Sequence, residues 1–155
     1  MELQRHLRVA HGYLELGLHT DAQDELDHVP IQLRMRSDFL LVQCHLLRKQ
    51  ERWHDLEEVS QWLLESNLDE PELWVAHADA IRHARTLTEA TSCLVDALAR
   101  FPSNGHLLFQ MACYRCQGGD LAGARDFLQA AGQIDRLWKM LADIDVDLAP
   151  LRQRD

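Results

Sequence analysis

The sequence has few residues that interrupt helices and no long apolar run. Its 155 residues include only four prolines and seven glycines, and strand-like alternation of apolar and polar residues is absent. No segment approaches the ~20 consecutive apolar residues of a bilayer-spanning helix. With 46% hydrophobic and 26% charged residues, the composition is that of a soluble globular protein. This length predicts a single domain, residues 1–155, and no membrane association.

Cysteine is also scarce, and its four positions are irregularly spaced: Cys44, Cys93, Cys113 and Cys116. These are too few for a disulfide framework in a chain of this size, so we expect free thiols in a reducing compartment. The N-terminal residues run directly into amphipathic periodicity and show no secretory signal. Both observations favour a cytoplasmic location.

Positive charge is in deficit, with 16 Lys and Arg against 25 Asp and Glu and a formal net charge of −9. A nucleic-acid-binding protein needs a basic surface to displace counterions from phosphates. The charge balance therefore argues against a nucleic-acid partner.

What the sequence does contain is a repeat of helical segments. The prolines and glycines separate apolar runs of helical spacing, which predicts a string of antiparallel helices. Rows of 34 residues beginning at Leu3, Ser37, Pro71 and Gly105 align without insertion or deletion, giving repeats 3–36, 37–70, 71–104 and 105–138. Small or apolar residues then fall into four columns: Ala10, Cys44, Ala78, Ala112; Ala22, Leu56, Ala90, Ala124; Leu26, Ser60, Leu94, Leu128; and Val29, Leu63, Ala97, Ala131. Such columns are expected where helices cross closely and a small side chain receives a larger one.

The third row resembles the tetratricopeptide repeat (TPR) family most closely, through Trp74, Ala78, Ala90, Leu94, Ala97 and Pro102. The second row departs most, with Glu51 where the inter-helix glycine belongs, Leu56 for alanine and Ser60 for a large apolar residue. The resemblance covers residues 3–138. It implies an all-α fold, a right-handed superhelix of four helix-turn-helix TPR hairpins with a C-terminal capping helix. Residues 139–155 would supply that cap as one or two short helices broken before Pro150.

The resemblance also implies a concave groove, lined by the first helix of each hairpin, that holds a peptide or helix of a partner. The residues expected there are Leu7, His11, Leu41, His45, Arg48, Val75, Asp79, Arg82, Phe109, Cys113 and Cys116. Leu7, Leu41, Val75 and Phe109 form an apolar ladder, for which core packing is the alternative. Arg48 and Arg82 form a cationic centre that could clamp a carboxylate, and their alternative is that of solvated residues near helix ends.

Two other features of the sequence give weaker evidence for a function. Cys113 and Cys116, three residues apart, share a helix face, but a zinc site would need two further ligands, and buried or groove-lining small residues are the alternative. The lysine and asparagine set by which some TPR proteins grip chaperone tails is absent, because Leu7, His11, Leu41 and His45 occupy those positions.

These patterns favour a non-catalytic protein-interaction module or scaffold without cofactor or bound metal. Its partner would be a protein or peptide with apolar and acidic groups, and the module itself would be a monomer or weak homodimer. Two alternatives stay open at this stage. One is a small TPR chaperone of secreted substrates, and the other is a thiol- or metal-dependent enzyme that uses Cys113 and Cys116.

Overall fold

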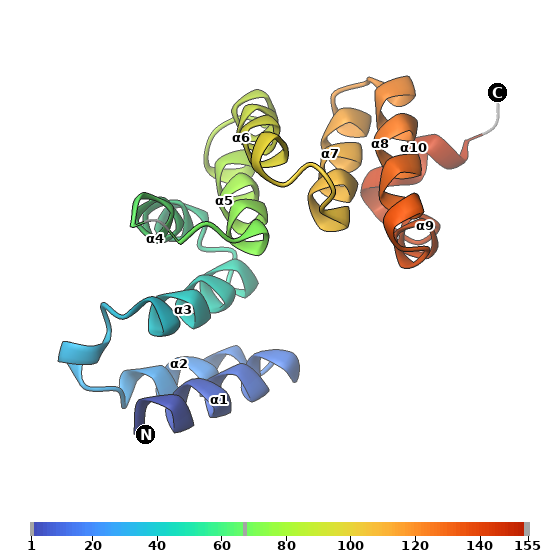
Figure 1. Cartoon of the computed structure of the whole chain (residues 1–155). Helices are drawn as coiled ribbons and strands as arrows, with labels where there is room; N and C mark the ends of the chain where they lie inside the picture. Colours follow the sequence, from blue (N-terminus) through green and yellow to red (C-terminus); the bar gives the residue numbers. More distant parts are fainter. Residues whose placement is uncertain (1, 67, 154–155) are drawn as a thin grey trace. The chain divides into compact units, whose positions relative to one another are not determined.

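The computed structural model describes residues 2–66 and 68–153, and within these ranges it is all-helical, with no strand. Ten α-helices and two short 3-10 helices are found in the described residues, packed mainly against their neighbours in sequence (Figure 1). None of these helices is both long and apolar enough to span a membrane. The chain divides into two compact units, Met1–Asp69 (unit 1) and Glu70–Asp155 (unit 2), which we describe separately.

Unit 1 consists of two helical hairpins. The first contains α1 (Glu2–Glu15) and α2 (His19–Asp27), and the second contains α3 (Ser37–Lys49) and α4 (Trp53–Glu65), with the short 3-10 helix η1 (Ile31–Leu33) between them. Helix α1 packs against both α2 and α3, and α3 packs against α4. The first helices of the two hairpins therefore lie next to each other, and their unburied sides form a shared surface.

Unit 2 contains two further hairpins and a C-terminal extension. The hairpins are α5 (Pro71–Ala84) with α6 (Leu87–Arg100), and α7 (Gly105–Gln117) with α8 (Leu121–Ile134). Next come α9 (Leu137–Ala142), the 3-10 helix η2 (Val146–Leu148) and α10 (Ala149–Arg152). Helix α9 packs on α8 and α7, whereas η2 packs on α7. The extension thus reaches back to a first helix.

The helix starts follow the predicted register. The second helices begin at residues 19, 53, 87 and 121, so successive starts differ by 34. Of the sixteen residues in the four predicted columns, fifteen are buried and Leu128 is partly buried. Ser60, the polar exception in its column, is fully buried because its hydroxyl donates a hydrogen bond to the Leu56 carbonyl oxygen at 2.6 Å. The column pattern was therefore a correct prediction of the core.

Local signals explain where several helices begin. Pro71 lies in the first turn of α5, where its missing N–H is not needed. The side chains of Thr86, Asn104 and Asp120 each accept a hydrogen bond from a backbone N–H in the first turn of α6, α7 and α8. These caps satisfy donors that a helix leaves unpaired at its start. Pro150 likewise lies in the first turn of α10.

The turn of the second hairpin keeps the geometry of its glycine-containing equivalents. Gly17 and Gly119 have φ values of 74° and 86°, and Glu51, at the equivalent position, has a φ of 56°. The next residue of each turn donates from its N–H at 2.9 Å to a carbonyl oxygen five residues earlier, as Arg52 does to Leu47. This hairpin, the least regular in sequence, thus closes in the same way with a glutamate in the left-handed region.

Candidate binding surface on the first helices

In unit 1, the first helices bring a pair of histidines together. His11 on α1 and His45 on α3 lie edge to face, with ring centroids 5.6 Å apart. The His11 side chain is 50% exposed, and its Nδ1 lies 3.6 Å from a carboxylate oxygen of Glu15, one turn later on α1. His45 is half-buried. The two rings are close enough to act on one bound group.

The surroundings of His45 are electropositive. Burial lowers the pKa of its imidazole, and the charges of His11, Lys49 and Arg48 lower this pKa further, with Glu15 acting in the opposite direction. Arg48 and Lys49 occupy the last turn of α3, where cations are favoured by the helix dipole. This part of an acidic protein therefore contains a local cluster of basic side chains. We call the surface of His11, Leu41, His45, Arg48 and Lys49 the α1–α3 face.

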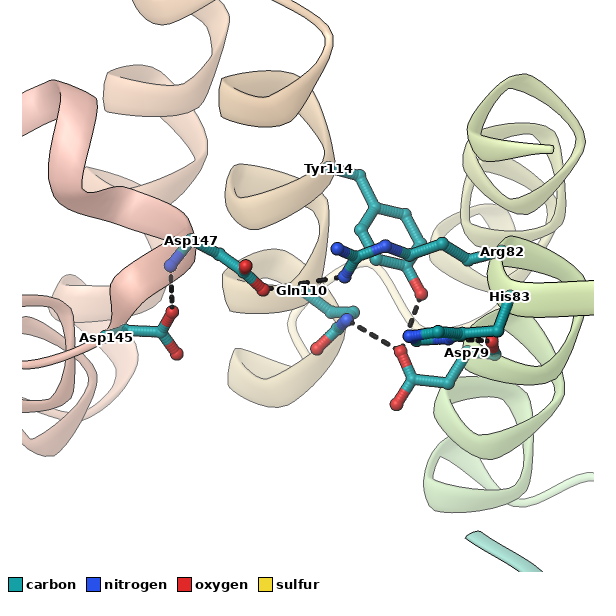
Figure 2. A network of polar contacts seen from close by, with 7 residues as sticks. All are labelled: Asp79, Arg82, His83, Gln110, Tyr114, Asp145 and Asp147. Carbon is teal, nitrogen blue, oxygen red and sulfur yellow. Dashed lines mark hydrogen bonds and ion pairs between the residues drawn. The ribbon is translucent and has the colours of Figure 1, made fainter. Parts of the chain in front are cut away.

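In unit 2, the corresponding helices carry a buried polar network (Figure 2). Asp79 of α5 is 7% exposed and accepts hydrogen bonds from the Tyr114 hydroxyl at 2.7 Å and the Gln110 amide at 3.0 Å. Burial raises the pKa of Tyr114, and the neighbouring Asp79 raises it further. Tyr114 thus stays a hydrogen-bond donor, and Asp79 joins α5 to α7 and is not displayed in an open groove.

Arg82 extends this network to the C-terminal extension. Its guanidinium lies over the Tyr114 ring, 5.5 Å from the centroid, and its Nη1 is 3.5 Å from a carboxylate oxygen of Asp147 (Figure 2). The sequence left two interpretations of Arg82 open, a clamp for a carboxylate of a partner and a solvated residue near a helix end. In the structure the carboxylate comes from the same chain, 65 residues later.

The extension is held against α7 by apolar and polar contacts. Leu148 is 1% exposed and belongs to the core of unit 2. The Asp145 carboxylate accepts the N–H of Asp147 at 2.8 Å, and Arg152 donates to the carbonyl oxygens of Ala142 at 2.6 Å and Asp145 at 2.9 Å. Residues 143–152 therefore form a turn that is held by its own hydrogen bonds, and this turn covers the side of α7 that was expected to be open.

This arrangement corrects the predicted groove. Six of its expected residues are buried: Leu7, Val75, Asp79, Phe109, Cys113 and Cys116. Phe109 is covered because Trp138 of α9 packs on it with ring centroids 5.3 Å apart. For Leu7, Val75 and Phe109 the structure therefore favours core packing over an exposed ladder, and Leu41 alone of the four is only half-buried.

The two cysteines of α7 lie next to the acidic residues of the extension. Burial raises the pKa of the Cys113 thiol, and Asp145 and Asp147 raise it further; burial and Asp147 also raise the pKa of Cys116. Thiols shifted in this direction are poor nucleophiles.

The Cys113 sulfur and one oxygen each of Asp145 and Asp147 lie within 4.8 Å of one another, a set that could contact a metal ion. The Arg82 guanidinium already neutralises Asp147 there, which disfavours a cation.

A separate hollow of about 350 Å³ lies between α6 and α7 and is lined by Leu87, Thr88, Thr91, Ser92, Val95, Tyr114, Arg115, Gly118 and Asp120. The Arg115 Nε is buried there without a hydrogen-bond acceptor. No sequence pattern predicted this hollow, because most of its lining comes from outward-facing positions of α6 and from α7 and the turn that follows it. Sequence reasoning also did not identify Gln110 and Tyr114, which hydrogen-bond Asp79 across the two helices. It missed Trp138 and Asp147 as well, because their roles depend on how the chain turns after α8. Of the expected groove residues, His11, Leu41, His45 and Arg48 form one partly exposed surface.

Neither a scan against protein-family models nor a search of curated proteins gives a match for this chain.

Proposed function

We propose that this chain is a non-catalytic interaction module of the TPR type. It would bind a segment of a partner protein that carries apolar and acidic groups, and the α1–α3 face of unit 1 would be the binding surface. Support for the repeat family comes from the 34-residue spacing of the helix starts and the buried columns. The raised pKa values of the Cys113 and Cys116 thiols disfavour the thiol-enzyme alternative.

One observation carries the proposal: the first helices of unit 2 already hold an acidic segment. Asp147 belongs to no hairpin, yet it pairs with Arg82 on the face expected to bind partners. Arg48 lies 34 residues before Arg82 and is therefore its repeat equivalent in unit 1 (82 − 48 = 34). The chain thus contains its own example of the interaction that this face would make with a partner.

Photo-crosslinking tests this proposal. The full chain would be expressed with p-benzoylphenylalanine at Leu41, a half-buried position on the α1–α3 face. A matched control carries the photoreactive residue at Val95 of α6, which is 49% exposed. We expect discrete crosslinked partners from position 41 that are absent from position 95. These products should weaken when His45→Glu reverses the local charge.

Equal products from both positions, or none from position 41, would contradict the proposal. Insensitivity of the products to His45→Glu would remove the electrostatic part, because apolar contact alone would then account for the capture. Circular dichroism of each variant verifies that the helices are retained.

A further inference from the structure

The two units can be compared position by position. Helices α3 and α7 begin at residues 37 and 105, a difference of 68, which is two repeats of 34. Adding 68 to Leu41, His45 and Arg48 gives Phe109, Cys113 and Cys116. The residues that the extension covers in unit 2 therefore have known counterparts on the α1–α3 face.

In unit 2, acidic side chains lie at two of these positions. Carboxylate oxygens of Asp145 and Asp147 lie within 4.8 Å of the Cys113 sulfur. The charge of Asp147 also acts on Cys116. At the first position, Phe109 packs on Trp138. The bound segment thus places an aromatic residue on the first position and, seven to nine residues later, two carboxylates near the other two (138 + 7 = 145; 138 + 9 = 147).

In unit 1, the same three positions are better suited to such a segment. Neutral thiols are replaced by His45 and Arg48, whose side chains are only partly buried. The second histidine of the pair, His11, adds a group 5.6 Å from His45. The charge of Arg48 acts on His45 whatever other contacts it makes. At these positions unit 2 offers two uncharged thiols, with Arg82 beside them as the partner of Asp147, whereas unit 1 offers imidazoles and a guanidinium.

We infer that the α1–α3 face binds an acidic–apolar segment with a carboxylate between His11 and His45, and that this binding takes up protons. The inference rests on the proposed function and specifies its ligand class: an aromatic or large apolar residue followed by acidic residues, as in the chain's own Trp138 and Asp145. A carboxylate is favoured over a metal ion, because Arg48 and Lys49 both repel a cation at His45.

The direction of the pH dependence follows from the charged groups that face the pair. On α1 these are His11 and Glu15, and on α3 they are His45, Arg48 and Lys49. In the free protein the net effect lowers the pKa of His45, so that its ring is mostly neutral at neutral pH. A bound carboxylate favours the protonated His45 ring and raises its pKa. Because the bound form then holds more protons, affinity increases as pH falls through the histidine range.

Glu15 is the carboxylate of the chain that already lies near this histidine pair, but its contact is too weak to take the place of a bound ligand. Its side chain is 68% exposed and its oxygen is 3.6 Å from His11, a loose, solvent-screened contact. A carboxylate held by a peptide that also contacts Leu41 can replace it. With a rise of about one pKa unit on one ring, affinity should increase several-fold from pH 8 to pH 5.5, and about tenfold is the limit at still lower pH.

The test uses the full chain and a fluorescein-labelled peptide that copies residues 137–149. A control peptide carries Asn in place of Asp143, Asp145 and Asp147. Binding is followed by fluorescence anisotropy at pH 8, 7 and 5.5, at fixed ionic strength and in the presence of EDTA. We expect saturable binding that tightens several-fold across this range, up to about tenfold, and at least tenfold weaker binding of the control peptide.

Variants locate the effect. The double substitution His11→Gln and His45→Gln should abolish the pH dependence, whereas His54→Gln, which removes an exposed histidine of α4, should preserve it. Binding that is independent of pH but weakened by Leu41→Ser would overturn the proton linkage and leave the proposed function intact. Binding that depends on Arg82 and not on His45 would place the peptide on unit 2 and overturn the assignment. Absence of saturable binding, or binding that appears only when zinc replaces EDTA, would also overturn it.

Discussion

Replacing Glu51 by glycine should stabilise unit 1. Glu51 has a φ of 56°, a conformation that only glycine adopts without a steric penalty. Its N–H donates to the Arg48 carbonyl oxygen at 3.1 Å, and the following residue donates at 2.9 Å to Leu47. The turn is therefore fixed by backbone hydrogen bonds, and the side chain must accept the left-handed geometry.

The magnitude follows from two opposing terms. The left-handed conformation costs about 1–2 kcal/mol for a residue with a Cβ. Glycine gains more freedom in the unfolded chain, which offsets roughly 0.5–1 kcal/mol. The side chain is exposed, so little contact is lost. We expect Glu51→Gly to raise the free energy of unfolding of unit 1 by about 0.5–1 kcal/mol.

Urea unfolding combined with hydrogen exchange measures this change. Circular dichroism gives the midpoint, and exchange of the α3 and α4 amides assigns any change to unit 1. Glu51→Ala is the matched control; it keeps the strain and should leave stability nearly unchanged. Gly17→Ala, at a φ of 74°, should destabilise by about 1 kcal/mol. If Glu51→Gly were no more stable than Glu51→Ala, the glutamate would not be strained and the reasoning would fail.

Three further predictions concern burial. Tyr114→Phe removes the donor to buried Asp79 and should lower the free energy of unfolding by about 1–3 kcal/mol in urea melts, and an unchanged midpoint would contradict the network. Leu148→Ala should destabilise by roughly 2–5 kcal/mol, since Leu148 is 1% exposed, and an effect below about 1 kcal/mol would show that the extension is not docked. Burial raises the pKa of Cys44 and Cys93 to about 12, so both thiols are protonated in the folded chain at pH 8 and should react with a disulfide reagent far more slowly than in urea. Equal rates in the two states would refute this prediction.

Much of the core could be predicted from the sequence because each repeat presents the same packing problem. The column of Ala10, Cys44, Ala78 and Ala112 is buried, since helix crossings require a small residue at that place in every hairpin. The 34-residue periodicity of the sequence therefore predicts which positions are buried in each hairpin. Even Glu51 adopts the left-handed conformation of Gly17 and Gly119, although Arg85, at the same place in the third repeat, has a φ of −131°.

The candidate surface was harder to predict because it depends on a segment outside the repeat. Whether Phe109 is exposed depends on Trp138, and whether Arg82 meets a partner or Asp147 depends on the direction of the chain after α8. Residues 143–152 have no repeat equivalent to guide that choice. The proximity of His11 and His45, by contrast, follows from the register, because residues 34 apart occupy equivalent places on adjacent first helices.

The most direct test of the central claim, that the α1–α3 face binds acidic–apolar segments, is a chemical-shift map of the full chain titrated with the peptide copying residues 137–149. Saturable shifts should be concentrated on α1 and α3 around Leu41 and His45, with the ring resonances of His11 and His45 moving toward their protonated positions. The His54 ring should stay unchanged. Saturable shifts confined to the hollow between α6 and α7, or to the site of Arg82, would contradict the claim.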